Sequence, residues 1–366
     1  MFDFVNPINY IHLHYYIVLV LTLVLFFSLV SKKDINNYNP KMSSALGIIY
    51  VLFLTFYIGL RPESYVFGDM VNYKRVFGYL QQNWSSKYLG RDVFFNSLTT
   101  FCAKTMSSTG YFFTIAIIYV IPCYLASKKL FKSYWYIGFI ALVGSFSFWS
   151  YGTNGLRNGL ATSIFLYALS FNNKIIQIIL MIAAMQFHKS LALPFGAYLI
   201  TLFFNNTQLF IRFWLLCIPI SLIAGSSFEA IFASIGFGDI GDRMQGYTEE
   251  TMLNEVTYNT GFRWDFLLYS ASGVYAGWYF TEKLKFKDKT YTTIFNIFLI
   301  ANAFWILVIR APFSNRFAYL SWFLLSIVII YPLLKQRLVN NQATKIGLIL
   351  LANFAFSFFM TVILGK

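Results

Sequence analysis

Charged side chains are scarce in this chain. Only 11% of the 366 residues are Asp, Glu, Lys or Arg, whereas 58% are hydrophobic. So little charge argues against an ordinary soluble domain, in which about a quarter of the residues are charged. Acids are the rarer sign, at 14 against 28 Lys and Arg, so the formal net charge is +14. The basic residues are scattered over short loops and form no stripe, which argues against nucleic-acid binding.

Cysteine and histidine are also rare, at three residues each. Cys102, Cys123 and Cys217 lie far apart and lack the paired spacing of a zinc site or a disulfide framework. We therefore expect neither a metal nor any other cofactor. The sequence also has no obvious inverted repeat, which counts against a secondary transporter.

Long apolar runs are what the chain has in abundance. Runs of about 17–21 residues recur along its length, and each is long enough to cross the ~30 Å hydrocarbon core of a bilayer. We predict an all-α polytopic membrane protein, with residues 1–366 forming a single integral membrane domain of about 12 transmembrane helices (roughly 10–13). The spans are expected at residues 14–30, 43–60, 109–126, 134–150, 156–171, 174–188, 190–204, 211–227, 263–281, 291–309, 313–333 and 345–363.

The loops between these runs fall into two sets of unequal charge. One set, called the basic set below, holds 15 cations and 3 acids, and the other holds 13 cations and 11 acids. The cations of the basic set are Lys32, Lys33, Lys41, Lys128, Lys129, Lys132, Lys174, Arg212, Lys283, Lys285, Lys287, Lys289, Lys335, Arg337 and Lys345, and its acids are Asp34, Glu282 and Asp288. Because cytoplasmic loops carry an excess of Lys and Arg, we expect the first set to be cytoplasmic. Both termini then lie on the outer side of the membrane.

Two segments on the outer side are longer than turns. Residues 61–108 carry apolar side chains at helical spacing, such as Phe77 and Leu80, and are predicted to form amphipathic helices on the outer surface. Residues 228–262 hold most of the outer acids together with Arg243, and we interpret them as a loop or lid over a substrate.

The outer ends of the predicted spans carry cations that membrane topology does not require. A helix N-terminus already has about half a positive charge, so a cation in its first turn becomes favourable where an anion docks. The alternative for each cation is that it reaches to headgroup phosphate. These cations at span ends are Arg157, His188, Lys189, Arg263, Arg310 and Arg316. Taken together, they indicate a site for a bulky anion, most simply a lipid diphosphate.

Arg157 is the strongest of these candidates. Its neighbours include Asn158, which is polar for a span end, and Gly155 and Gly159, which permit close backbone approach. The planar guanidinium also suits phosphate better than a lysine does. For Arg310 and Arg316, a tie between loops is the main alternative.

Three groups are candidates for a general base. Asp69 lies near Arg61 and four residues before Tyr73, so a carboxylate kept ionised by Arg61 would share a helix face with the tyrosine. The alternative for Asp69 is a structural role, as a helix cap or in a salt bridge to Arg61 or Lys74. Asp92 has the same two interpretations, general base or structural cap or salt bridge, and we favour the structural one. His188 is a packing residue or, with its pKa lowered beside a lysine, a neutral base.

Several of these motifs resemble the EpsG-like branch of the Wzy-type bacterial polysaccharide polymerases. The resemblance lies in GLRNGLATSIFLYALSFNNK followed by FHKSLALPF, in the upstream LRPESYVFGDMVNY and in the late IRAPFSNRFAYL. The family often has an acid followed by Pro or Gly after the first outer segment. The equivalent stretch here reads LGRDVFF, which leaves the role of Asp92 open.

The resemblance implies a metal-independent glycosyltransferase with a fold related to the GT-C class. Such enzymes transfer a growing glycan from polyprenyl diphosphate, such as undecaprenyl diphosphate, onto a lipid-linked repeat unit at the outer face of the bacterial cytoplasmic membrane. The implied partners are the lipid-linked donor and acceptor and the bilayer itself. A chain-length regulator protein is left open as a further partner.

In this scheme Arg157 and Arg316 hold the leaving diphosphate, together with Arg61 or Arg310. The acceptor hydroxyl is deprotonated by Asp69 or His188. The remaining substrate contacts are assigned to Tyr73, Asn158, Lys189 and Arg243. An O-antigen-type ligase would use the same chemistry, so residue types do not separate it from a polymerase. A flippase or exporter would need charges buried in mid-span, and the middles of the predicted spans hold almost none.

Overall fold

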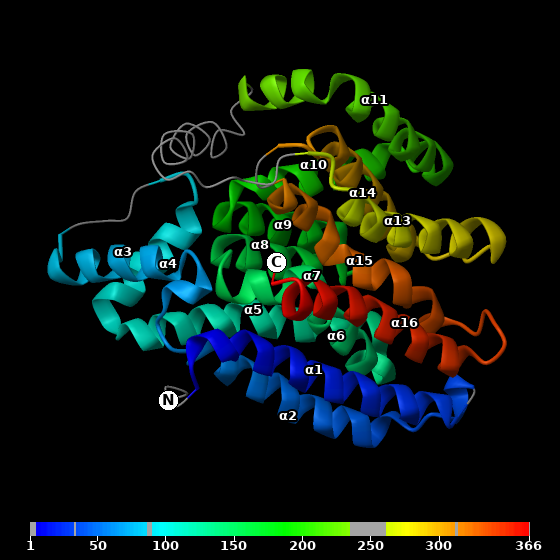
Figure 1. The fold of residues 1–366 in the computed structure, drawn as a ribbon, viewed down its shortest axis with the longest axis horizontal. Helices are drawn as coiled ribbons and strands as arrows, with labels where there is room; N and C mark the ends of the chain where they lie inside the picture. The colour runs from blue at the N-terminus through cyan, green and yellow to red at the C-terminus, as the bar shows by residue number, and fades with distance from the viewer. Residues whose placement is uncertain (1–4, 33, 86–89, 235–260, 312–313, 366) are drawn as a thin grey trace. The chain divides into compact units, whose positions relative to one another are not determined.

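The computed structural model describes residues 5–32, 34–85, 90–234, 261–311 and 314–365. All regular structure within these ranges is helical, as Figure 1 shows. Six helices among the described residues are long and apolar enough to cross a membrane. They are Pro7–Val30, Ser108–Val143, Thr207–Gly225, Lys289–Leu307, Asn315–Lys335 and Gln342–Ile363. An all-α membrane architecture is therefore confirmed, but the predicted count of about 12 spans is not.

The shortfall has a physical cause in the middle of the chain. Three apolar helices, α8 (Leu156–Leu169), α9 (Lys174–Phe187) and α10 (Ala192–Phe203), have only 14, 14 and 12 residues. At 1.5 Å per residue they extend roughly 18–21 Å, which is less than the ~30 Å of a hydrocarbon core. Apolar composition predicted spans here, but helix breaks keep the segments short.

The chain divides into two compact units. The first comprises Met1–Ala192 with Ser326–Lys366, and the second comprises Leu193–Leu325. The single integral membrane domain expected over residues 1–366 stays a prediction.

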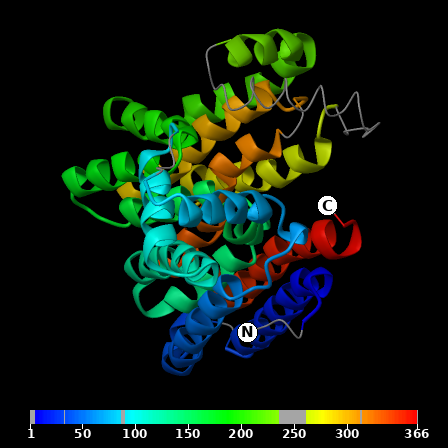
Figure 2. The ribbon, with the colours of Figure 1, turned by 90° about the vertical axis from the view of Figure 1, so that its left-hand side faces the viewer.

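The first unit holds α1 to α9, the end of α15 (Asn315–Lys335) and α16. Helices α1 and α16 lie side by side in both views (Figures 1 and 2), and α5 packs against α2, α6 and α8. The bounds not yet given are α2 Pro40–Gly59, α3 Met70–Gln82, α4 Val93–Thr105, α5 Ser108–Phe131, α6 Trp135–Val143, α7 Phe146–Thr153 and α16 Gln342–Phe358, with α1 at Pro7–Val30.

Tyr10 of α1 and Tyr57 of α2 join these two helices. Their rings stack with centroids 4.1 Å apart, and each hydroxyl donates to the other residue's backbone carbonyl.

Several loops of the basic set meet at one end of this unit. Arg337 pairs with Asp34 at 3.3 Å, and the Tyr134 hydroxyl donates to the carbonyl of Ile35 at 3.2 Å. The grouping of these loops by charge thus agrees with their contacts. Which end faces the cytoplasm stays a prediction from the charge count.

The chain between α6 and α7 interrupts the run predicted as one span at residues 134–150. The break is stabilised from α16, where the Asn353 side chain donates to the carbonyl of Ala141 at 3.0 Å and the Ser357 hydroxyl donates to that of Gly144 at 2.8 Å. Non-helical backbone in a membrane protein needs such partners, because lipid cannot hydrogen-bond to it.

Two helices, α3 and α4, occupy the segment 61–108, as predicted. Their amphipathic character is visible in α3, where Phe77 and Leu80 are buried while Val71 and Tyr79 are exposed. Their place on the outer surface stays a prediction. Most of the predicted 228–262 loop, including Arg243, lies outside the described residues.

The second unit contains most of α10, α11 (Thr207–Ser234), α13 (Trp264–Trp278), α14 (Lys289–Leu307) and the start of α15. Asn302 joins four of these helices through a buried network. Its side chain accepts from the Trp214 indole at 2.8 Å and donates to the hydroxyls of Ser270 and Ser321 at 3.0 and 2.9 Å. A satisfied buried network of this kind fixes how the helices pack.

Candidate active site

The carboxylate of Asp92 is the centre of the cluster that brings the predicted residues together. Asp92 precedes α4 and is only 4% exposed, and its side chain does not cap its own helix. Its Oδ2 accepts from Nη1 of Arg157 at 2.8 Å and contacts Nδ1 of His188 at 3.0 Å. Its Oδ1 accepts from the backbone N–H of Lys189 at 3.0 Å. One side chain thus joins α4, α8 and the end of α9.

Arg157 is positioned by the close approach of α7 and α8. It lies in the first turn of α8, and a side chain at Gly159, two residues later, would overlap the backbone carbonyl of Tyr151. Only glycine allows α8 to begin this close to α7. The Asp92 carboxylate offsets the unfavourable placement of a cation at the positive end of a helix.

His188 and Lys189 are presented by a break in the helix. The backbone of His188 is extended, with φ −157° and ψ 123°, between the end of α9 and the 3-10 turn η4 (Lys189–Leu191). The Lys189 N–H begins this short turn, so it has no helical carbonyl to bond to. Asp92 supplies the missing acceptor.

The pKa of Asp92 lies below its ordinary value. Burial acts to raise it, but the hydrogen bond and charge of His188, the charge of Arg157 and the N–H of Lys189 together outweigh that effect. The carboxylate is therefore ionised at neutral pH. Because both its oxygens already accept hydrogen bonds and the side chain is buried, the geometry suits Asp92 to holding its partners better than to accepting a proton from a substrate.

An ionised carboxylate can only accept, so Nδ1 of His188 must carry the proton in this contact. In a neutral imidazole Nε2 is then the basic nitrogen. Among the residues that the structure describes, Nε2 of His188 makes no hydrogen bond, and the side chain is 12% exposed. A carboxylate that fixes one ring nitrogen and leaves the other open is the arrangement of a general base.

Lys189 and Asn158 complete the cluster. The Lys189 ammonium donates to Gln186 at 3.1 Å and makes no ion pair with any residue in the described ranges. The Ser190 hydroxyl donates to Oδ1 of Asn158 at 2.8 Å, which ties η4 to α8. Two cations, Arg157 and Lys189, accompany one anion, so the cluster is positive even with His188 neutral.

Arg61 has a structural role, because its guanidinium bonds to backbone carbonyls. Its buried guanidinium donates to the carbonyl of Ile58 at 2.6 Å and to that of Thr153 at 3.0 Å, at the ends of α2 and α7. Phe67 and Phe112 flank it at 5.6 and 5.4 Å. Burial lowers its pKa to about 10, so it remains a cation at neutral pH.

Asp69 lies on the segment that Arg61 fixes. Its backbone N–H donates to Oδ1 of Asn154 at 2.9 Å, three residues before Arg157. Gly68 has φ +60°, and a side chain there would overlap Asn154. The Asp69 carboxylate makes no hydrogen bond or ion pair among the described residues. Tyr73 is buried against Phe95, with ring centroids 5.4 Å apart.

Three other predicted cations, Arg263, Arg310 and Arg316, belong to the second unit. There Arg310 donates to the carbonyl of Leu222 at 3.3 Å. Arg263 pairs with Asp265 at 2.7 Å. Arg243 lies outside the described residues. Within the described ranges, no three His, Cys, Asp or Glu side chains lie together as a metal ion would require.

A sequence profile of the EpsG family matches residues 44–366, a span that contains the whole Asp92 cluster. The chain belongs to the EpsG family. The resemblance found in the sequence is thereby confirmed, and family membership indicates a polysaccharide-polymerase type of function. No curated protein and no solved structure matched the chain.

The sequence favoured a structural role for Asp92, as a cap or in a salt bridge, but it did not identify Arg157 and His188 as its partners. One signal was present: the chain has no acid between Asp92 and Glu229. A cation in that stretch that needs a buried anionic partner must therefore find it far away in the sequence. The contacts of Asp92 with Arg157 and His188 span 65 and 96 residues.

Replacing Asp92 with Asn should lower the free energy of unfolding by about 1–3 kcal/mol, the value of hydrogen bonds to a charged group. Because folding lowers the pKa of Asp92 below 3.8, this contribution is fully present above that pH and is lost as the pH falls through the native pKa. Thermal unfolding of the purified protein should therefore show the same deficit at about pH 7 and about pH 5.

The matched control is Asp265→Asn, which removes a more exposed ion pair and should cost less. A deficit for Asp92→Asn that disappears by about pH 5 would contradict the assignment of a depressed pKa.

Proposed function

We propose that the chain is a polysaccharide polymerase. It transfers a growing glycan from polyprenyl diphosphate onto a lipid-linked repeat unit at the outer face of the bacterial cytoplasmic membrane. The observation that carries the proposal is that a guanidinium and an imidazole share one buried carboxylate oxygen. A diphosphate leaving group needs a cation, and an acceptor hydroxyl needs a base. Membership in the EpsG family supports the same reaction.

Arg157 and Lys189 bind the leaving diphosphate in this proposal and offset its developing negative charge. As the acceptor oxygen bonds to the anomeric carbon, the bond from that carbon to the diphosphate breaks and its electron pair goes to the diphosphate. A guanidinium has five N–H donors, and the Asp92 contact uses one terminal nitrogen of Arg157. Lys189, exposed and without an ion pair among the described residues, adds a second charge. No metal ion takes part in this scheme.

The proton from the acceptor hydroxyl goes to Nε2 of His188. Asp92 holds the ring through Nδ1 and stabilises the imidazolium that forms. Nη1 of Arg157 and Nδ1 of His188 cannot be farther apart than the sum of their distances to the shared oxygen. The developing charge and the proton acceptor are therefore close enough to serve one reaction centre.

The other residues have supporting roles in the proposal. Asn158, held by Ser190, is placed to bind substrate beside Arg157. Asp69 is the alternative base, because its carboxylate has no other partner among the described residues. We assign Arg61 and Tyr73 to holding the segment that carries Asp69. Arg310, Arg316 and Arg243 are proposed as further contacts to diphosphate or sugar.

Arg157→Ala should abolish long chains while leaving the amount of protein in the membrane unchanged. Removing a donor that stabilises developing charge costs about 100- to 1,000-fold in rate. The measurement is a gel of surface polysaccharide from cells that carry only the variant, with membrane abundance followed in parallel. Arg75→Ala is the control, since Arg75 is exposed on α3 and, among the residues that the structure describes, bonds only to Asn72. Normal chain lengths at equal abundance would refute the role of Arg157.

The variant His188→Asn tests whether Nε2 is the general base without removing the hydrogen bond that ties residue 188 to Asp92. An asparagine keeps an N–H near the place of Nδ1, so the bond to Asp92 survives, but it has nothing at the position of Nε2. Transfer should fall by about 100-fold or more while the protein folds normally. Asp69→Asn is the parallel variant. If His188→Asn elongates chains normally and Asp69→Asn does not, Asp69 is the base; if both do, the base lies elsewhere.

A further inference from the structure

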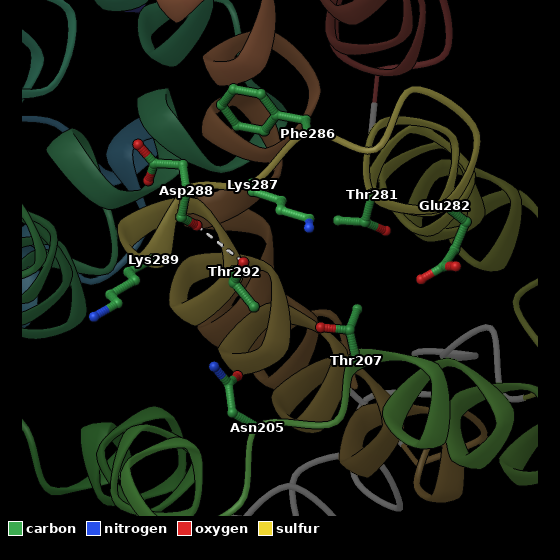
Figure 3. A pocket seen from close by; sticks show the side chains of 9 residues that line it. All are labelled: Asn205, Thr207, Thr281, Glu282, Phe286, Lys287, Asp288, Lys289 and Thr292. Carbon is green, nitrogen blue, oxygen red and sulfur yellow. Dashed lines mark hydrogen bonds between the residues drawn. The ribbon is translucent and has the colours of Figure 1, made fainter.

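The second unit contains a cavity of about 400 Å³ that the transfer reaction does not use. It lies where the loop between α10 and α11 meets the loop before α14, and Figure 3 shows the side chains around it. Both loops belong to the basic set, so this end is the cytoplasmic one if the charge count gives the orientation.

The cavity has two lysines with no anionic partner. Lys287 and Lys289 line it, are exposed, and make no ion pair within the described part of the chain. Figure 3 shows Lys287 extending toward the middle of the ring of labelled side chains, whereas Lys289 points outward. Because the lining also holds two acids, Glu282 and Asp288, its character depends on which of these charges face the cavity.

The two acids at the cavity are already engaged. Glu282 accepts from the Gln208 amide at 2.9 Å and lies 3.6 Å from the Lys285 ammonium. Asp288 caps α14 by accepting from the N–H of Tyr291 at 2.8 Å. In Figure 3 the Asp288 carboxylate is turned away from the middle of the ring.

Neutral donors supplement the lysines. The fully buried Asn296 donates its Nδ2 to Oδ1 of Asn205 at 2.5 Å, which leaves the NH₂ end of Asn205 to border the cavity. Helix α11 begins at Thr207 and α14 at Lys289, and both residues line the cavity. Asn206 and Asp288 already cap these helices by accepting from the N–H groups of Leu209 and Tyr291, so the donors left for a ligand are those of the side chains. The ammonium of Lys287 together with the neutral donors favours a ligand that is negatively charged.

An apolar stripe leads away from this site along α11. Leu209, Phe213 and Leu216 are spaced on one helix face and are 46%, 46% and 54% exposed. A ligand with a charged head and hydrocarbon chains would place its head in the cavity and its chains along this stripe. The stripe favours a lipid over a free anion.

We propose that this cavity binds a phosphate group, supplied by the headgroup of an anionic phospholipid or by free phosphate. Basic pockets beside membrane helices are suited to such headgroups. The lysines give charge, and Asn205 and Thr207 give directed hydrogen bonds. The site is independent of the proposed transfer reaction, because none of its residues belongs to the Asp92 cluster.

The test is binding of short-chain phosphatidylglycerol, of inorganic phosphate and of short-chain diacylglycerol to the purified full chain, followed by native mass spectrometry and by the shift in melting temperature. Replacing both lysines with Gln should weaken phosphatidylglycerol binding by about tenfold or more, since charge-assisted hydrogen bonds are lost. Replacing both with Arg should preserve it.

Lys345→Gln is the matched control, because it removes one exposed cation from the same basic set outside the cavity. Phosphatidylglycerol binding without phosphate binding identifies a lipid site, and binding of both shows that the phosphate group suffices. Equal affinity of the Gln double variant and the wild type, or equal binding of diacylglycerol, would overturn the proposal.

Discussion

A buried carboxylate needs partners, and those that Asp92 finds organise the first unit around it. Removing a charge from water costs several kcal/mol, which only hydrogen bonds and opposite charges offset. Arg157 in α8 supplies one of them, and His188 and the Lys189 N–H, at the end of α9, supply the others. The contact that keeps Asp92 ionised therefore also sets where a guanidinium and an imidazole stand relative to each other.

The same contact explains why the helices here are short. Helix α9 stops at Phe187, and the extended backbone of His188 leaves an N–H that has no helical acceptor. Away from water such a group must be bonded within the protein, and Asp92 bonds it. The irregular backbone and the candidate active site are thus one feature, in which a helix break presents two functional side chains.

Local sequence pattern predicted the helices and the cations, but not the anchor. Apolar runs located the helical segments, and cations at span ends identified Arg157 and His188. The end of α9 at Phe187 agrees with the predicted boundary between the spans 174–188 and 190–204. The break at Gly144 was missed because hydropathy reports composition and not the polar partners, such as Ser357, that make a break stable. Asp92 was undervalued because its contacts cross 65 and 96 residues, and no local pattern records such distant pairing.

If Asp92 and Arg157 work as one unit, a double-mutant cycle on the elongation rate should reveal it most directly. Purified protein would be supplied with lipid-linked repeats, and Asp92→Asn and Arg157→Lys would be measured singly and together. The account predicts strong non-additivity, with the double variant scarcely slower than the slower single variant. Losses that multiply, as they do for independent sites, would contradict the claim that the carboxylate acts through the arginine.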